Sequence, residues 1–208
     1  MAGFRALAAV GLSIESLLNL RFLDEQVVEV GRPLKAILVN ADDFANRNTP
    51  GSTIDRPAVS IYFYRLSVDH ETRPAWSAVS AADGVPRIPL RMHFLLSAWG
   101  GGAQVEMEWL GLAARILERD CLLTGPMLDP LGEWRAGEGI QVVVDDLALD
   151  SMSEAFQALT TDYRLCIPYL ARVVVLEAGP LPVDEPVATA AFGTRRTGPG
   201  VLRSGGVR

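Results

Sequence analysis

The chain has 208 residues, of which 49% are hydrophobic and 21% are charged, and its formal net charge is −6. This composition excludes a chain disordered in bulk, and the negative charge argues against a nucleic-acid partner, which needs a concentrated basic surface. No apolar run approaches the ~18 residues that cross a bilayer, so we expect neither a membrane span nor a membrane partner.

The C-terminal segment differs in composition from the rest of the chain. Residues 179–208 are rich in Pro, Gly, Thr, Ser and Arg and lack hydrophobic periodicity, which predicts a flexible tail that does not fold alone. From residue 178 onward four arginines outweigh Asp184 and Glu185, a net charge of +2, so residues 1–177 carry −8. We therefore expect one domain at 1–178 and a tail at 179–208.

The chain begins with a stretch that superficially looks like a secretory signal. Glu15 interrupts it early, however, and apolar residues continue beyond it at three- and four-residue spacing. This pattern predicts a structural helix over residues 3–23 and a protein that is cytoplasmic when made. One or two strands follow within 26–41, broken near Gly31, and the composition of 42–56 predicts a loop.

Two long strands are predicted in the middle of the chain, separated by a loop from Asp69 to Pro86. The first begins at Pro57. The second, residues 88–99, places only apolar residues on one face, at Leu90, Met92, Phe94, Leu96 and Ala98. A two-residue period of this kind is typical of a strand, and we expect residues 88–99 to lie centrally in a sheet.

The second half of the chain continues with alternating elements. The spacing of apolar residues predicts a helix over 103–119, a short strand over 140–144 and a helix over 151–159 that begins with a capping box. The last strand, residues 164–177, is apolar on both faces, so it is buried on both sides or pairs with a neighbouring subunit. Because Pro168 cannot donate a hydrogen bond, we expect a kink, a bulge or an edge there. These elements predict an α+β domain with a central mixed sheet.

Few residues suit catalysis or metal binding. His93 shares a strand face with polar residues, which favours a hydrogen-bonded structural histidine. Cys121 and Cys166 form no pair with metal-ligand or redox spacing, and we expect both to be buried thiols. A less favoured hypothesis is a metal-dependent enzyme, whose ligands would come from four acidic residues, Asp42, Asp43, Asp145 and Asp146. We otherwise expect no cofactor and no catalytic site.

Four sequence blocks occur in an order that resembles a known family. They are the strand 57–66 with Arg73 after it, the segment 88–100 (Ile-Pro-Leu-Arg-Met-His-Phe-Leu-Leu-Ser-Ala-Trp-Gly), the helix 108–117, and 162–176 with Tyr-Arg-Leu before Pro168. Over roughly residues 4–177 the chain is similar to the cap, or tail-terminator, proteins of extracellular contractile injection systems, the phage-tail-like particles of the antifeeding prophage type. Pro168 and the tail depart from the family pattern.

This resemblance implies a structural protein, a homohexameric ring that closes the baseplate-distal end of the sheath and inner tube. The particle would assemble in the cytoplasm and could be released by lysis. Long polar loops at 42–56 and 68–86 and the tail are the expected contact surfaces. The candidate contact residues are Arg73, Arg195, Arg196 and Arg203. An alternative is a minor connector or tail-completion protein of a phage.

Overall fold

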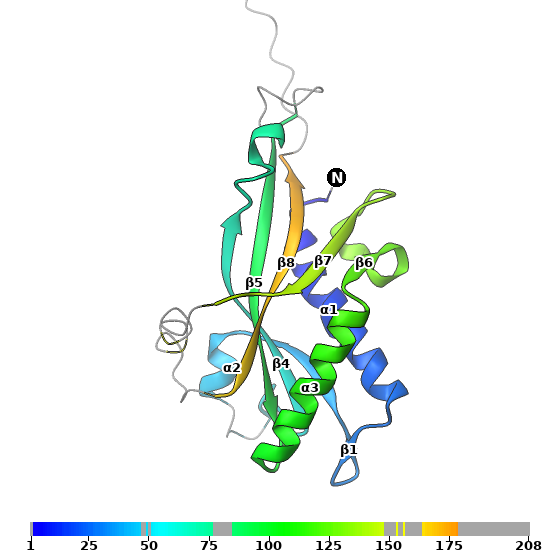
Figure 1. Cartoon of the computed structure of the whole chain (residues 1–208), viewed down its shortest axis with the longest axis vertical. Coiled ribbons are helices and arrows are strands. Elements are labelled where there is room, and N and C mark those ends of the chain that lie inside the picture. The colour runs from blue at the N-terminus through cyan, green and yellow to red at the C-terminus, as the bar shows by residue number, and fades with distance from the viewer. Residues whose placement is uncertain are drawn as a thin grey trace, which may run out of the picture.

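The computed structural model describes residues 2–46, 49, 51–76, 85–147, 153, 156 and 164–178. Their main feature is a six-stranded mixed sheet in the order β3-β4-β5-β8-β7-β6 (Figure 1). β3 runs parallel to β4, and every other neighbouring pair in this sheet is antiparallel. The strands are β3 (Lys35–Val39), β4 (Ala58–Val68), β5 (Arg87–Trp99), β6 (Leu122–Thr124), β7 (Gly139–Val144) and β8 (Cys166–Glu177).

The strand predicted to be central, β5, lies between β4 and β8. Its five alternating apolar residues all face the larger of two hydrophobic cores, as the two-residue period predicted. Phe94 is fully buried there, stacked on Tyr169 of β8 with ring centroids 5.5 Å apart and tilted against Phe63 of β4 at 5.0 Å. The α+β class and the mixed sheet are confirmed.

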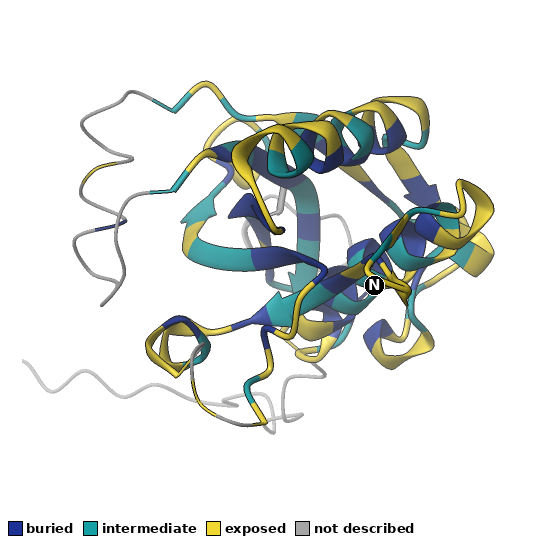
Figure 2. Ribbon diagram, turned by 90° about the horizontal axis from the view of Figure 1, so that it is seen from below, coloured by how far each residue is buried: buried dark blue, intermediate teal, exposed yellow. Residues whose placement is uncertain are grey.

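Two long helices, α1 (Ala6–Asp24) and α3 (Ala103–Arg119), supply the other side of this larger core. Their bounds agree with the predicted helices 3–23 and 103–119 to within three residues. The large buried side chains of both helices belong to this core, and Figure 2 shows one long helix with its buried residues toward the sheet and its exposed residues toward the outside. The apolar stripe therefore marks the packed face of α3 and most of the packed face of α1, where Leu20 and Leu23 are exposed instead.

Helix α1 is also long and apolar enough to cross a membrane, with a mean hydropathy of 1.5 over an 18-residue window. The expectation that no stretch comes close to this was wrong, because it counted unbroken apolar runs, whereas a window average tolerates interspersed polar residues. Half of the window is buried inside the protein. This burial is what a core helix of a folded domain shows.

A smaller core fills the opposite face of the sheet, and the predicted loop 42–56 is partly wrong because of it. Helix α2 (Ala41–Ala45) forms within this stretch and places Phe44 in the smaller core, where Ile54 also packs. Leu95 and Trp99, on the second face of β5, complete it together with Phe156. The loop composition hid a short helix whose single large apolar residue covers the sheet.

Trp99 is tied into this smaller core by polar contacts as well as by packing. Its ring N–H donates to the Ser60 hydroxyl at 2.8 Å, and that hydroxyl donates to the Ser97 carbonyl at 3.2 Å. The guanidinium of Arg164 lies over the indole, 4.2 Å from its centroid. A buried tryptophan N–H normally finds such a partner, so β5 is fixed to β4 at this end by side chains as well as by the ladder.

Of the three possibilities expected at Pro168, a kink, a bulge or an edge, the structure shows an edge: the proline lies where the pairing of β8 with β7 has ended. β7 stops pairing with β8 at Val144 and Tyr169, so the proline lies just beyond the ladder on that side. Only its carbonyl is used there, accepting from the Asp145 backbone N–H at 3.0 Å. The irregularity in the β5–β8 pairing lies elsewhere, between Leu90 and Met92. Among the described residues, the missing N–H of the proline therefore interrupts no pairing with β7.

Several short elements escaped prediction. β6 and the 3₁₀ helices η2 (Gly125–Met127) and η3 (Pro130–Gly132) lie between the predicted helix 103–119 and the predicted strand 140–144, where no element was expected. The region near Gly31 forms a separate two-stranded hairpin of β1 (Val28–Glu29) and β2 (Arg32–Pro33). Of the helix predicted at 151–159, Ser153 and Phe156 are helical, and its other residues lie outside the described part of the chain.

Both cysteines are free thiols in the structure. Cys166 is buried, as predicted, and burial raises the pKa of its thiol to about 11. Cys121 is only partly buried, so the expectation was too strong for this residue. A thiol with a raised pKa is a poor nucleophile, and Cys166 therefore acts as a small core residue.

Candidate assembly surface

Two of the four acidic residues considered as metal ligands, Asp43 and Asp145, have local structural roles. Asp43 and Asn40 form a capping box at the start of α2: the Asn40 side chain accepts from the Asp42 and Asp43 backbone N–H groups at 2.8 and 3.2 Å, and Asp43 accepts from the Asn40 N–H at 2.8 Å. Asp145 instead contacts His93. Within the described ranges, no three His, Cys, Asp or Glu side chains are grouped to hold a metal ion.

His93 is hydrogen-bonded on both ring nitrogens, which confirms its predicted structural character. Nδ1 lies 2.7 Å from the Asp145 carboxylate, and Nε2 lies 2.8 Å from the Ser67 hydroxyl. With the carboxylate as acceptor, Nδ1 carries the proton in the neutral ring, and Nε2 accepts from the serine. The three side chains join β4, β5 and the residue following β7 across the sheet.

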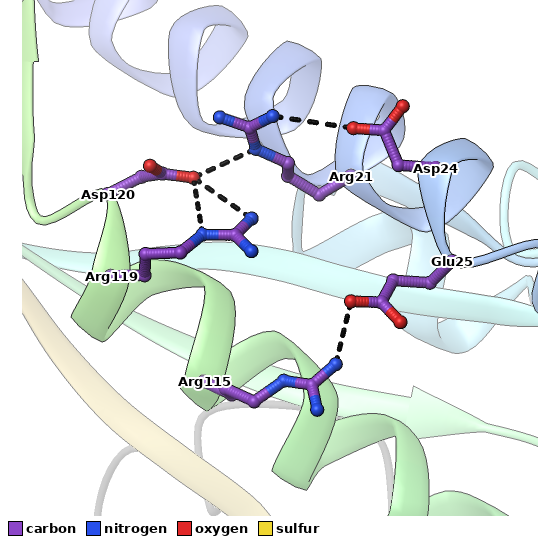
Figure 3. A network of polar contacts seen from close by, with 6 residues as sticks. All are labelled: Arg21, Asp24, Glu25, Arg115, Arg119 and Asp120. Carbon is purple, nitrogen blue, oxygen red and sulfur yellow. Dashed lines mark hydrogen bonds and ion pairs between the residues drawn. The ribbon is translucent and has the colours of Figure 1, made fainter.

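Ion pairs connect α1 to the end of α3 (Figure 3). Arg21 of α1 contacts Asp120 at 2.9 Å and Asp24 at 3.3 Å, and Arg115 contacts Glu25 at 2.7 Å. Burial raises the pKa of Asp120, but the hydrogen bond and charge of Arg21, together with Arg119, outweigh it, so the net pKa lies below the ordinary value. The Asp120 carboxylate therefore stabilises the packing of α1 on α3 in its charged form.

Replacing Asp120 by Asn should remove the pH-dependent part of the stability that comes from the charged Asp120 carboxylate. A lowered folded-state pKa stabilises the protein above the unfolded value of about 3.9, and this contribution is lost as the pH falls through the folded value. We expect D120N to melt below wild type at neutral pH, with a difference that shrinks below about pH 4. D24N, which alters the more exposed partner, is the control for circular-dichroism melts. A difference independent of pH would contradict this role of Asp120.

The hairpin at the end of α1 presents an apolar tip. Val30 and Gly31 are its two loop residues, with φ of 48° and 76°, the pattern of a type I′ turn. Val30 is 95% exposed. A β-branched residue is disfavoured at positive φ, so neither local conformation nor core packing explains this valine. Exposed apolar residues occur throughout the end of α1 and the hairpin that follows it, and we call these residues together the hairpin patch: Leu20, Leu23, Val28 and Val30.

The hairpin is fixed to the body by polar contacts. The Glu29 carboxylate accepts from the Gly101 backbone N–H at 2.9 Å, next to the start of α3. Arg32 donates to the Arg56 carbonyl at 3.0 Å and pairs with Asp55 at 2.9 Å. A rigidly held apolar tip is suited to contact another protein, because little conformational entropy is lost on binding.

Replacing Val30 by Asn should stabilise the isolated chain. Asn-Gly is the preferred sequence of a type I′ turn, and relief of the strained valine is expected to raise the free energy of unfolding by about 0.5–1 kcal/mol. The opposite change, G31A, places a Cβ at φ 76° with no neighbour within 4 Å, so it should destabilise through backbone strain alone. Urea unfolding measures both variants. A destabilised V30N would mean that the valine supports the fold.

A second feature is an open sheet edge beside an apolar groove. β3 pairs with β4 only as far as Val39 and Tyr62, so residues 63–68 of β4 have β5 on one side and no described strand on the other. A groove of about 580 Å³, here called the β4 groove, runs beside this edge between β4 and α1. Its lining residues include Leu7, Gly11, Leu38, Phe63, Leu66 and Met92, with Asn40 and Asp43 also contributing.

The candidate contact residue Arg73 makes a hydrogen bond within its own chain. It begins the 3₁₀ helix η1 (Arg73–Trp76), and its guanidinium donates to the Arg87 carbonyl at the start of β5. Its part in assembly stays a prediction. Arg195, Arg196 and Arg203 lie outside the described residues.

The hairpin tip and the open edge were both missed in the sequence, although signals existed. A two-residue spacer ending in glycine between Val28-Glu29 and Arg32-Pro33 is a hairpin signal. The strand predicted from Pro57 was also longer than the one before it, and a long strand beside a short one leaves part of its edge unpaired.

Comparison with known proteins gives a family and a fold. The family model described as the Pvc16 N-terminal domain matches residues 9–190. A sheath/tube terminator of an extracellular contractile injection system, PVC, in its extended state is similar in structure with a TM-score of 0.51 and 17% identity, over 90% of this chain and 64% of that one. The tube-terminating cap of the anti-feeding prophage has a TM-score of 0.50 and 16% identity, over 89% and 60%.

The similarity covers only part of the length of each of these two terminators. This chain covers less than two thirds of the length of either one. At this level of identity the similarity shows that the fold is shared. No curated protein matches the sequence.

Proposed function

Because the chain belongs to the Pvc16 N-terminal domain family, we propose that it is the terminator cap of a contractile injection system. The supporting observation is that the family match and both structural similarities run through nearly the whole described domain. In this role the protein acts by shape: it binds the last layer of a growing helical stack and offers no site for a further layer.

We further propose that six copies form a ring that contacts the sheath and the inner tube. A closed ring requires two different complementary surfaces on each subunit, because its contacts are head-to-tail. The hairpin patch supplies a candidate for one of them, since it is apolar, exposed and rigidly held. Assembly would take place in the cytoplasm, with release of the particle by lysis.

This function involves no catalysis, although Ser67, His93 and Asp145 lie at the distances of a hydrolase triad. A triad also needs backbone N–H donors that converge on a developing oxyanion. Ser67 lies within β4, paired opposite Arg91, and successive N–H groups along a strand point in opposite directions. The arrangement is therefore suited to joining three strands.

A serine-reactive probe tests this distinction. We expect no covalent labelling of the full chain by a fluorophosphonate, and H93Q should lower thermal stability without changing labelling. Intact mass spectrometry reads the labelling directly. Stoichiometric modification of Ser67 that disappears in H93Q would show an active nucleophile and contradict a purely structural role.

The mass of the purified protein tests the ring. We expect particles with the mass of six 22.5-kDa chains, either alone or after mixing with the sheath and tube proteins of the same gene cluster. V30N should weaken this assembly, whereas M107Q, at a 55% exposed position on α3, should leave it unchanged. A chain that stays monomeric in every mixture would contradict the ring.

A further inference from the structure

The β4 groove is an apolar surface that no described element covers. Leu66 lines it and is 52% exposed, and Met92, the partner of Leu66 on β5, lines it too. The pairing of β4 with β5 shifts at Tyr64, between Phe63 and Arg65, where β4 contains one extra residue. Because of this bulge, Phe63 and Leu66 lie on the same side of the sheet although they are three residues apart, and both line the groove.

Helix α1 closes the neighbouring sheet edge but leaves this groove open. The Asn19 side-chain amide donates to the Ala36 carbonyl at 3.0 Å and accepts from the Ala36 N–H at 2.9 Å. Glu15 accepts from the Leu38 N–H at 3.2 Å. Helix side chains therefore occupy the backbone groups of β3 that another strand could use. One turn earlier, Gly11 of α1 has no side chain, and the groove opens there. An apolar groove left open beside a closed edge indicates a place for a protein partner.

The hairpin patch of the same chain has the complementary form. Val30 projects at its tip with 95% exposure, and among the described residues no large apolar side chain is more exposed. Its positive φ is disfavoured for valine, so the free chain holds this side chain outward at a cost in stability. The contact of Glu29 with Gly101 fixes the tip in this position. A fixed, convex apolar tip can enter a concave apolar groove with little loss of conformational entropy.

We propose that the hairpin patch of one copy binds in the β4 groove of a second copy of the same chain, and this contact rests on the ring proposed above. The tip cannot reach the groove of its own subunit. Gly11 in the groove and Leu23 in the patch both lie on α1, about 18 Å apart at 1.5 Å per residue. Figure 1 shows the hairpin, labelled β1, at the end of α1 that lies far from the N-terminus. The contact therefore joins two molecules.

Charge supports the pairing of these two surfaces. Residues 23–30 contain three acidic residues and no basic one: Asp24, Glu25 and Glu29. The Asp24 side chain keeps 59% exposure although it contacts Arg21. Arg65 lines the groove, is exposed and has no ion pair with another described residue. The acidic residue of the groove, Asp43, already accepts from a backbone N–H. An acidic and apolar stretch thus faces an apolar groove with an unpaired arginine.

A contact of this kind is head-to-tail, because each copy contributes two different surfaces. Head-to-tail contacts form a ring if the rotation between copies closes and a filament if it does not. In a closed ring every hairpin patch and every β4 groove is filled, so the assembled chain offers neither surface to a further copy. This property suits a protein that ends a stack.

Disulfide cross-linking of the assembled chain tests the contact. The variant V30C/L66C, made with C121S to remove the partly buried native thiol, carries one cysteine at the tip and one in the groove. V30C/M107C in the same background is the matched control, because Met107 is 55% exposed on α3. Upon oxidation V30C/L66C should give at least about tenfold more linked chains larger than dimers than the control, because a disulfide needs Cα atoms within about 7 Å. Reduction should remove them, and melting temperatures verify that each variant is folded.

The outcomes decide the contact separately from the ring. Linked chains of three or more copies in V30C/L66C support the contact, whatever number of copies the ring contains. Particles with the mass of six chains but without such linkage would overturn the contact and leave the ring standing. Dimers of V30C alone that form as efficiently would show that two hairpin patches bind each other, which would also overturn it. A chain that stays monomeric and unlinked in every mixture would contradict both the contact and the ring.

Discussion

Replacing Phe94 by Ala is expected to lower the free energy of unfolding by about 3–5 kcal/mol, the largest effect of any single substitution considered. Phe94 lies at the centre of β5, fully buried, with the Tyr169 ring on one neighbouring strand and the Phe63 ring on the other. Truncation removes both ring contacts and leaves a cavity that the paired strands on either side prevent from collapsing. The loss of unfolding free energy should therefore exceed the free energy of transferring the phenyl side chain from the core to water, because the cavity adds to it.

Urea denaturation measures this loss. The matched control is F4A, because Phe4 is 81% exposed and should change the stability by less than about 0.5 kcal/mol. A loss in F94A below about 1 kcal/mol would mean that β5 is not the centre of the core. The unfolding slope should stay constant, since neither variant changes the surface exposed on unfolding by much.

Replacing Gly132 by Ala is expected to destabilise the protein by about 2 kcal/mol. A Cβ at this position would lie 2.3 Å from the Trp134 ring, which cannot move freely because its N–H donates to the Asp129 carbonyl at 2.7 Å. The same turn also contacts the N-terminal segment, where the Gly3 N–H donates to the Gly132 carbonyl at 3.2 Å. The added methyl group must displace one of these contacts.

The control for G132A is the same substitution in an open position. Gly111 lies in the middle of α3 with no atom within 4 Å of a built Cβ. G111A should therefore raise stability by up to about 1 kcal/mol, because alanine favours the helix over glycine. Thermal unfolding of the two variants should shift in opposite directions. A shift of both in the same direction would contradict the packing described for Gly132.

The elements that were predictable share one property, a strong periodic pattern over many residues. β5 shows five apolar residues at alternate positions, and α3 shows its stripe over four turns, so each sequence fits one type of element. The central position of β5 was predicted because one of its faces is entirely apolar, and the structure buries residues on both faces. Long-range pairing was not needed for either prediction.

The features that were missed depend on contacts between distant residues. Helix α2 is five residues long, too short for a period to be visible. Asn40 fell at the end of a predicted strand and Asp43 in a predicted loop, as a possible metal ligand, although the two residues cap this helix. The Asp145–His93 contact joins residues 52 positions apart. No local pattern encodes a contact of that kind, so the role of Asp145 was not predictable.

The candidate surface was the least predictable part. The open edge exists because β4 continues for six residues past the end of its pairing with β3, which requires knowledge of the register. The exposure of Val30 likewise follows from a hairpin whose loop is only two residues long. A valine read as part of a strand, within 26–32, turned out to be the tip of a projecting turn.

The length of particles assembled without this chain tests the central proposal most directly. Particles would be purified from a strain that lacks the protein and from the same strain complemented with wild type or with H93Q, and their lengths measured by electron microscopy. We expect the deletion to give sheaths and tubes of broad or abnormal length with open ends, and both complemented strains to restore one length. Closed particles of normal length and normal contraction in the deletion strain would contradict a terminator function.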